Sequence, residues 1–219
     1  RNYDNTELAE WEKLYINALI LNLKSKNKES NEIIIGLMDK YGSSIEDSLK
    51  MQLLETRMKN SVNMFNYIDA VYCTETIINN YGKLLDSTEA DDMRNSLVIW
   101  KAAENLKEQG VEITGDSKLN FKRDLAGLIN IPVKCGAVEE NFVFDTGANF
   151  SVVNKSYAKK LKLIMLKGKI KVGSITGAKI ESELAYAELL EIGSMKFRNV
   201  LFLVMPDESL SFAGGLYVI

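Results

Sequence analysis

The distribution of glycine, valine and proline divides this chain near Gly110 into two parts that favour different secondary structure. Of 14 glycines, three precede Gly110 and eleven lie at or after it. Three valines precede Gly110 and ten follow it, and both prolines lie in the second part. Few helix breakers favour helices in the first part, whereas glycines and β-branched residues favour strands and turns in the second. The sequence therefore predicts an α+β multidomain protein, with an all-α helical-hairpin domain at residues 1–115 and a mostly β domain at residues 116–219.

The first part contains stretches in which apolar residues recur with helical periodicity. They predict helices at residues 7–24, 31–41, 45–58, 62–81 and 88–109. Two helix ends, Leu37–Gly42 and Ile77–Gly82, resemble each other and lie 40 residues apart. Such a period indicates a short helix-hairpin array of the tetratricopeptide-like kind, with a surface that binds a peptide or protein partner. An irregular helical bundle that supports or covers the second domain is the alternative interpretation.

The chain contains no histidine, and this absence limits the chemistry that it can perform. Catalytic triads and Cys–His dyads need an imidazole base, so acid–base chemistry must come from carboxylates, lysines, tyrosines or water. Two cysteines without histidine do not make an ordinary zinc site, so we expect no metal. Cys73 and Cys135 lie in different parts, which favours two buried free thiols over a disulfide. A net charge of −3 argues against a nucleic-acid partner. We expect no transmembrane segment, because no apolar run reaches the required length.

The segment with the clearest chemical signature surrounds Asp145. An apolar strand at Phe142–Phe144 leads to this carboxylate, and the chain continues into a second apolar pair, Val152-Val153. Gly147 allows the backbone to approach a neighbour or a ligand closely. The Thr146 hydroxyl can form a hydrogen bond to an opposing loop. An ordinary turn-forming aspartate in a β-hairpin is the structural alternative.

The sequence Asp145-Thr146-Gly147-Ala148 after an apolar strand resembles the aspartic peptidases, and Ala148 and the single copy of the motif are similar to their retropepsin-like branch. The resemblance implies a peptidase barrel over about the last 100 residues. It also implies that Asp145 is catalytic, with Thr146 and Gly147 shaping the loop. In this family two aspartates share one proton and activate a water molecule, and no cofactor is needed. A chain with one such loop would supply one aspartate to each active site of a homodimer.

A second segment, Ile170–Ile180, predicts a strand, a turn flanked by glycines, and another strand. It corresponds to the flap that closes over substrate in retropepsins, where glycines help a lid to flex. The resemblance thus implies a polypeptide substrate, held in extended form by backbone hydrogen bonds. Asn149 and Ser151 are candidates for supporting the catalytic loop. The substrate-binding candidates are Ala148, Gly173, Ser174, Ile175, Thr176 and Gly177.

The C-terminal part departs from the family pattern. Retropepsins carry two apolar residues and a glycine near their end, and Phe212-Ala213-Gly214 is a poor substitute. We therefore expect either a barrel that is incomplete at its C-terminal end or residues missing near Gly214-Gly215.

Two kinds of function follow from these features. The first is an aspartic endopeptidase acting as a homodimer; the second is a catalytically inactive or latent peptidase-like protein whose helical domain binds a protein partner. A bacterial source is compatible with the resemblance. Because the chain begins at Arg1 rather than at a methionine, a periplasmic or cell-surface location is weakly favoured over a cytoplasmic one.

Overall fold

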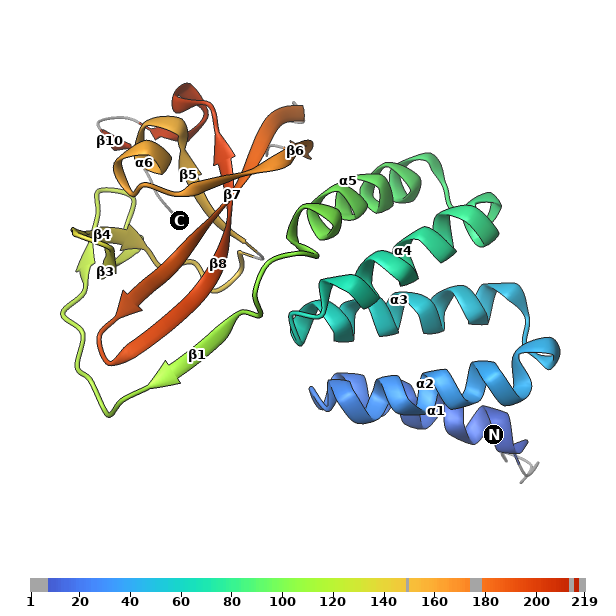
Figure 1. The fold of residues 1–219 in the computed structure, drawn as a ribbon. Coiled ribbons are helices and arrows are strands. Elements are labelled where there is room, and N and C mark those ends of the chain that lie inside the picture. Colours follow the sequence, from blue (N-terminus) through green and yellow to red (C-terminus); the bar gives the residue numbers. More distant parts are fainter. Residues whose placement is uncertain (1–7, 149, 174–178, 213–214, 217–219) are drawn as a thin grey trace. The chain divides into compact units, whose positions relative to one another are not determined.

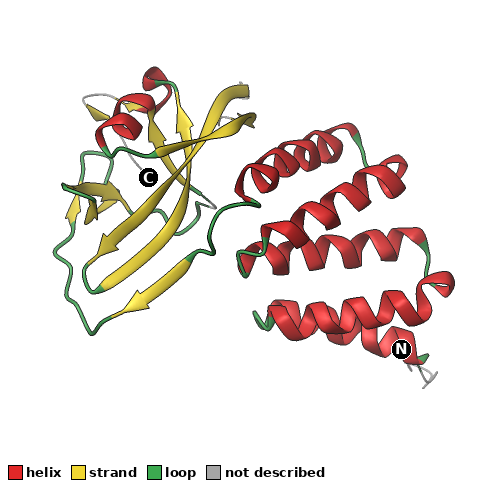
Figure 2. Cartoon of the chain, viewed as in Figure 1, coloured by secondary structure: helices red, strands yellow, loops and turns green. Residues whose placement is uncertain are grey.

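The computed structural model describes residues 8–148, 150–173, 179–212 and 215–216. The chain divides into two compact units, Arg1–Glu104 and Asn105–Ile219 (Figure 1). Helices build the first unit and strands dominate the second (Figure 2). The predicted fold class, a helical region followed by a mostly β region, is confirmed.

The helical unit consists of helices joined by short turns, and each of the five predicted helices is found with at least one end shifted. The described helices are α1 (Glu10–Leu23), α2 (Asn27–Tyr41), α3 (Asp47–Asn63), α4 (Tyr67–Tyr81) and α5 (Ser87–Ala103), with 3-10 turns η1 (Gly42–Ser44) after α2 and η2 (Gly82–Leu84) after α4. Consecutive helices pack against one another, so each buries an apolar face. Five buried side chains from α1, α2, α3 and the turn just before α3 form a hydrophobic core: Ala18, Ile34, Leu37, Ile45 and Leu53.

The elements of the helical unit recur at an offset of 40 residues. Helix α2 spans residues 27 to 41 and α4 spans 67 to 81; α3 spans 47 to 63 and α5 spans 87 to 103. The turns recur as well, because Ser25 and Phe65 both adopt a left-handed backbone with φ of 55° and 57°. The sequence similarity noted at the two helix ends therefore extends to helix boundaries and turn geometry.

The division between the units lies earlier than the predicted boundary after residue 115. Helix α5 ends at Ala103 instead of near residue 109, and strand β1 (Gly110–Ile113) already pairs with a strand of the second unit. Val111 and Ile113 alternate with Glu112. This period of two indicates a strand.

The second unit is built on an eight-stranded sheet in the described residues. Its further elements are β2 (Lys122–Arg123), β3 (Ile129–Cys135), β4 (Val138–Val143), β5 (Ser151–Asn154), α6 (Lys155–Lys160), β6 (Ile164–Gly173), β7 (Lys179–Ile192), β8 (Met195–Met205), η3 (Asp207–Leu210), β9 (Ser211–Phe212) and β10 (Gly215–Leu216). Strands β7 and β8 form a long antiparallel hairpin. Strand β8 pairs on its other side with β1 and, in parallel, with β5. Strand β9 forms a separate small antiparallel pair with β10.

Buried side chains from several strands form one core in this unit. Val153 of β5, Ala185 of β7 and Phe202 of β8 are at most 1 % exposed and belong to the same cluster. These strands are distant in sequence, so their packing fixes where the loops between them emerge. The loop that follows β4 is one of these.

Candidate functional site

The Asp145 loop begins where strand β4 ends. Asn130 pairs with Val143 in the β3–β4 hairpin, and the Phe144 amide continues the ladder by donating to the Ile129 carbonyl at 2.8 Å. Pairing therefore holds the chain up to the residue before Asp145. The carboxylate lies just beyond this last anchored position, where its side chain is exposed to solvent.

Local hydrogen bonds set the shape of the loop. The Gly147 amide donates to Oδ1 of Asp145 at 2.8 Å, and the Ala148 amide donates to the Asp145 carbonyl at 3.3 Å. A Cβ atom on Gly147 would lie 3.3 Å from Asp145 Oδ1, which is tighter than most such contacts. The absence of a side chain at Gly147 therefore lets the backbone amide and the carboxylate approach each other. The Thr146 side chain is exposed on the same loop.

A pocket of about 250 Å³ lies next to Asp145. Asp145, Ala148 and Ser151 contribute to its wall, and the other contributors are mostly apolar. These apolar residues come from β3, β4, β7 and β8 and from the loop itself: Ile131, Val133, Phe142, Val143, Phe144, Phe150, Leu190, Ile192 and Phe202. An exposed carboxylate beside an apolar hollow can reach a polar group of a ligand whose side chain enters that hollow.

The apolar wall of this pocket was not among the sequence-based candidates. Ile129, Ile131 and Val133 alternate with polar residues or proline, which signals a strand with one buried face. That pattern predicts burial but does not indicate which strands converge at Asp145. The convergence depends on the pairing of β3 with β7 and of β5 with β8.

The other predicted site residues are placed to different extents. Ser151 opens β5 and pairs with Phe202 of β8. Strands β6 and β7 form the predicted hairpin, in which Gly173 pairs with Lys179. Four predicted site residues that follow Gly173 in the sequence lie outside the described residues, as does Asn149: Ser174, Ile175, Thr176 and Gly177.

Two further features bear on metal ions and membranes. In the described ranges, no group of three or more His, Cys, Asp or Glu side chains is arranged to hold a metal ion. No described helix combines the length and apolar character that crossing a bilayer requires.

Cys73 and Cys135 are both buried and free, as predicted. Burial raises the pKa of the Cys73 thiol to about 12, an effect to which the nearby Asp69 carboxylate adds.

Comparison with known proteins gives a consistent result for the second unit. Residues 131–215 match the family model described as aspartyl protease. This match confirms, for that segment, the resemblance predicted from the Asp145 loop, and the segment is aspartyl protease-like. A comparison with curated proteins finds no match.

Among solved structures, the chain is similar to a retropepsin-like aspartic protease from Rickettsia conorii. The two share 23 % sequence identity, with a TM-score of 0.28. The similarity covers 45 % of this chain and 67 % of the other.

Proposed function

We propose that the protein is an aspartic endopeptidase in which two copies of the chain form one active site. The observation that carries this proposal is the exposed Asp145 carboxylate, oriented by the Gly147 amide beside an apolar pocket. The aspartyl protease-like segment includes this loop. Carboxylates and water suffice for this chemistry, which suits a chain without histidine.

In this proposal the two Asp145 carboxyl groups share one proton, because two carboxylates in contact do not both ionise. The ionised group accepts a proton from a water molecule, whose oxygen attacks the peptide carbonyl carbon. The protonated group donates its proton to the carbonyl oxygen. The tetrahedral intermediate then collapses, the C–N bond breaks, and the leaving amine takes up a proton.

A second copy is required because the chain carries a single Asp-Thr-Gly sequence. Surface features next to the loop support such an assembly. Phe144, the residue before Asp145, is 53 % exposed. Its amide pairs with Ile129, and the residue before Ile129, Leu128, is 45 % exposed. Bringing two Asp145 side chains together about a twofold axis would cover these neighbours, and apolar groups are self-complementary across such an axis.

The proposed substrate is a polypeptide in extended conformation. Ala148 lines the pocket beside Asp145. Residues 173–177 are proposed as the lid from their sequence alone, by resemblance to the flap of retropepsins. Thr146 and Gly147 shape the loop, and Asn149 and Ser151 support it. The mostly apolar wall favours a peptide with an apolar side chain at the cleavage site.

Replacing the carboxylate tests the proposal directly. Asp145→Asn should abolish cleavage of a denatured protein substrate and the pepstatin-sensitive part of the activity, while the circular dichroism spectrum stays unchanged. Asp116→Asn is a matched control, because Asp116 is an exposed aspartate of the same unit. Full cleavage by Asp145→Asn would rule out the proposed mechanism.

A second candidate function is partner binding by the helical unit, which would act as a helical repeat. The observation that favours it is a set of exposed apolar side chains on α1: Ile16, Ile20 and Leu23. Under this function the peptidase-like unit is inactive, or is latent until a partner binds.

A further inference from the structure

Helix α1 carries an apolar stripe on its surface. Ile16, Ile20 and Leu23 are spaced four and three residues apart, so they lie on one face of the helix. Their exposed fractions are 42 %, 42 % and 83 %. A stripe of this kind on a surface helix normally faces another element.

The 40-residue offset shows what covers the position equivalent to Ile20 in the later helices. Ile20 of α1 corresponds to Asn60 of α3 and to Trp100 of α5. Asn60 is 0 % exposed and Trp100 is 6 % exposed. Ile16 corresponds to Thr56, which is 7 % exposed. In both later helices, therefore, the position equivalent to Ile20 is buried.

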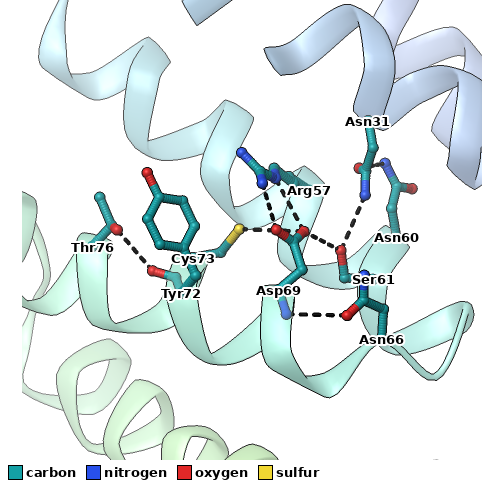
Figure 3. A network of polar contacts seen from close by, with 9 residues as sticks. All are labelled: Asn31, Arg57, Asn60, Ser61, Asn66, Asp69, Tyr72, Cys73 and Thr76. Atoms are coloured by element: carbon teal, nitrogen blue, oxygen red, sulfur yellow. Dashed lines mark hydrogen bonds and ion pairs between the residues drawn. The ribbon is translucent and has the colours of Figure 1, made fainter. Parts of the chain in front are cut away.

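The element that covers α3 at this position is the preceding helix pair. Asn60 Nδ2 donates to Ser30 Oγ at 2.9 Å and to Asn31 Oδ1 at 2.8 Å, both on α2. Asn22 of α1 donates to Asn60 Oδ1 at 2.8 Å. Figure 3 shows Asn31 of α2 beside Asn60 and Ser61 of α3. These hydrogen bonds satisfy the polar side chains that become buried where α2 packs on α3.

The equivalent contact on α5 is apolar instead of polar. Trp100 stacks on Tyr67 of the preceding helix α4, with ring centroids 5.8 Å apart and planes inclined by 15°. A preceding helix thus covers the equivalent position on both α3 and α5, through polar contacts on α3 and through apolar contacts on α5. Ile20 resembles the apolar form, because its side chain offers no hydrogen-bonding group.

Helix α1 does not have the surface of a terminal cap. End helices of repeat arrays carry a polar outer face, since no neighbour covers them. The outer face of α1 is apolar along Ile16, Ile20 and Leu23. At one end this face carries a charge, because Lys13 is exposed there. The equivalent residue of α3 is Leu53, which is 0 % exposed.

From these relationships we propose that the outer face of α1 is a docking surface for an amphipathic helix of a partner protein. The helix would pack on α1 as α4 packs on α5, with an apolar stripe against Ile16, Ile20 and Leu23 and a carboxylate facing Lys13. This inference rests on the second candidate function and names its surface and the chemistry of its partner. It does not depend on peptide cleavage.

The test uses the full chain and a helix-stabilised peptide with the sequence of α4, Tyr67–Tyr81, carrying a fluorescent label. This peptide is the probe because α4 covers the equivalent position of α5. Anisotropy should show saturable binding to the wild type. Ile20→Asp should weaken binding about tenfold or more, because it places a charge in the apolar contact. Lys13→Glu should weaken it less. Ile68→Asp is the matched control, since Ile68 is 69 % exposed on α4, outside this face.

Each outcome decides the proposal. Wild-type binding that Ile20→Asp reduces and Ile68→Asp leaves unchanged supports it, provided that both variants keep the wild-type melting temperature. Absence of saturable binding up to about 1 mM peptide overturns it, as does equal binding by Ile20→Asp. A wild-type dimer that Ile20→Asp converts to a monomer also overturns it, because a second copy would then cover the face. Asp145→Asn should bind the peptide as the wild type does, so failure of docking and failure of catalysis are read separately.

Discussion

The backbone amide of Gly147 donates a hydrogen bond of 2.8 Å to Oδ1 of Asp145. The bond holds one carboxylate oxygen against the loop and leaves the other free to interact with a ligand. It also brings the α-carbon of Gly147 so near that an added Cβ would lie 3.3 Å from the same oxygen. Orientation of the carboxylate and the identity of residue 147 are therefore coupled.

Gly147→Ala is the first prediction. The methyl group should turn the carboxylate away from its present orientation, and kcat/KM for peptide cleavage should fall about tenfold, equivalent to roughly 1.4 kcal/mol in the activation free energy. The free energy of unfolding should change by less than about 0.5 kcal/mol, because the loop is exposed. Steady-state kinetics and urea unfolding measure the two effects. Gly110→Ala is the control, since a Cβ there meets no atom within 4 Å; equal kinetics for both variants would contradict the prediction.

Phe144→Asp tests whether the surface beside Asp145 joins two copies. A charge on each side of a twofold axis should repel, so the variant should sediment as a monomer at concentrations where the wild type is a dimer. Its specific activity should rise with protein concentration. Phe121→Asp is the matched control, because Phe121 is similarly exposed in the same unit. A wild-type dimer mass in Phe144→Asp would exclude Phe144 from the interface.

Asn60→Ala tests the polar network between α2 and α3. Removing the side chain takes one hydrogen-bond partner from each of Asn22, Ser30 and Asn31, and Ser30 and Asn31 are buried. The free energy of unfolding should therefore drop by about 2–3 kcal/mol, as measured by urea denaturation. Asn63→Ala, at an exposed position of the same helix, should cost less than about 0.5 kcal/mol. Similar losses in both variants would contradict the contribution assigned to the network, because Ala has a higher helix propensity than Asn and propensity alone would not destabilise either variant.

The Asp207 carboxylate gives a prediction about pH. Hydrogen bonds from the Ser156 amide at 2.9 Å and hydroxyl at 2.7 Å hold the pKa of Asp207 below its ordinary value of about 3.9. A lowered pKa contributes stability that is present above the ordinary value and is lost as the pH falls through the lowered one. Asp207→Asn should therefore lower the urea midpoint at pH 7. In strong acid, the urea midpoints of the variant and of the wild type should become equal. A difference in urea midpoint that stays constant from pH 7 to strong acid would contradict the assignment.

The sequence predicts the helices well in number and less well in extent. Helix α2 begins at Asn27, four residues before the predicted start at residue 31. Its first turns are polar, and Ser30 and Asn31 are nevertheless buried, because Asn60 pairs with both. A polar residue that is buried by a distant partner gives no local signal.

The turn between α3 and α4 shows a second limit. We predicted that a helix begins at Val62, but α3 continues to Asn63 and α4 begins at Tyr67. The chain reverses through Phe65, which adopts a left-handed backbone with φ of 57°. Phenylalanine rarely marks such a turn, since bulky residues avoid positive φ. The hydrogen bond of 2.8 Å from the Asn66 amide to the Ser61 carbonyl stabilises this turn.

For the candidate site, local pattern and long-range pairing contribute differently. The Asp145 loop is predictable because an apolar strand, an aspartate and a glycine are adjacent in sequence. The pocket beside it is not, because Ile131, Leu190 and Phe202 come from three strands whose order only the sheet defines. A local motif thus identified the carboxylate, and strand pairing supplied its surroundings.

The 40-residue offset has a consequence for how such a protein can change in size. Residues 47–86 begin at the start of α3 and end just before α5, which starts at the equivalent position 87. A tandem duplication of this segment would recreate both junctions with the same helix starts and the same 3-10 turn. The helical part can therefore be lengthened in whole modules without changing the sequence that enters the β unit.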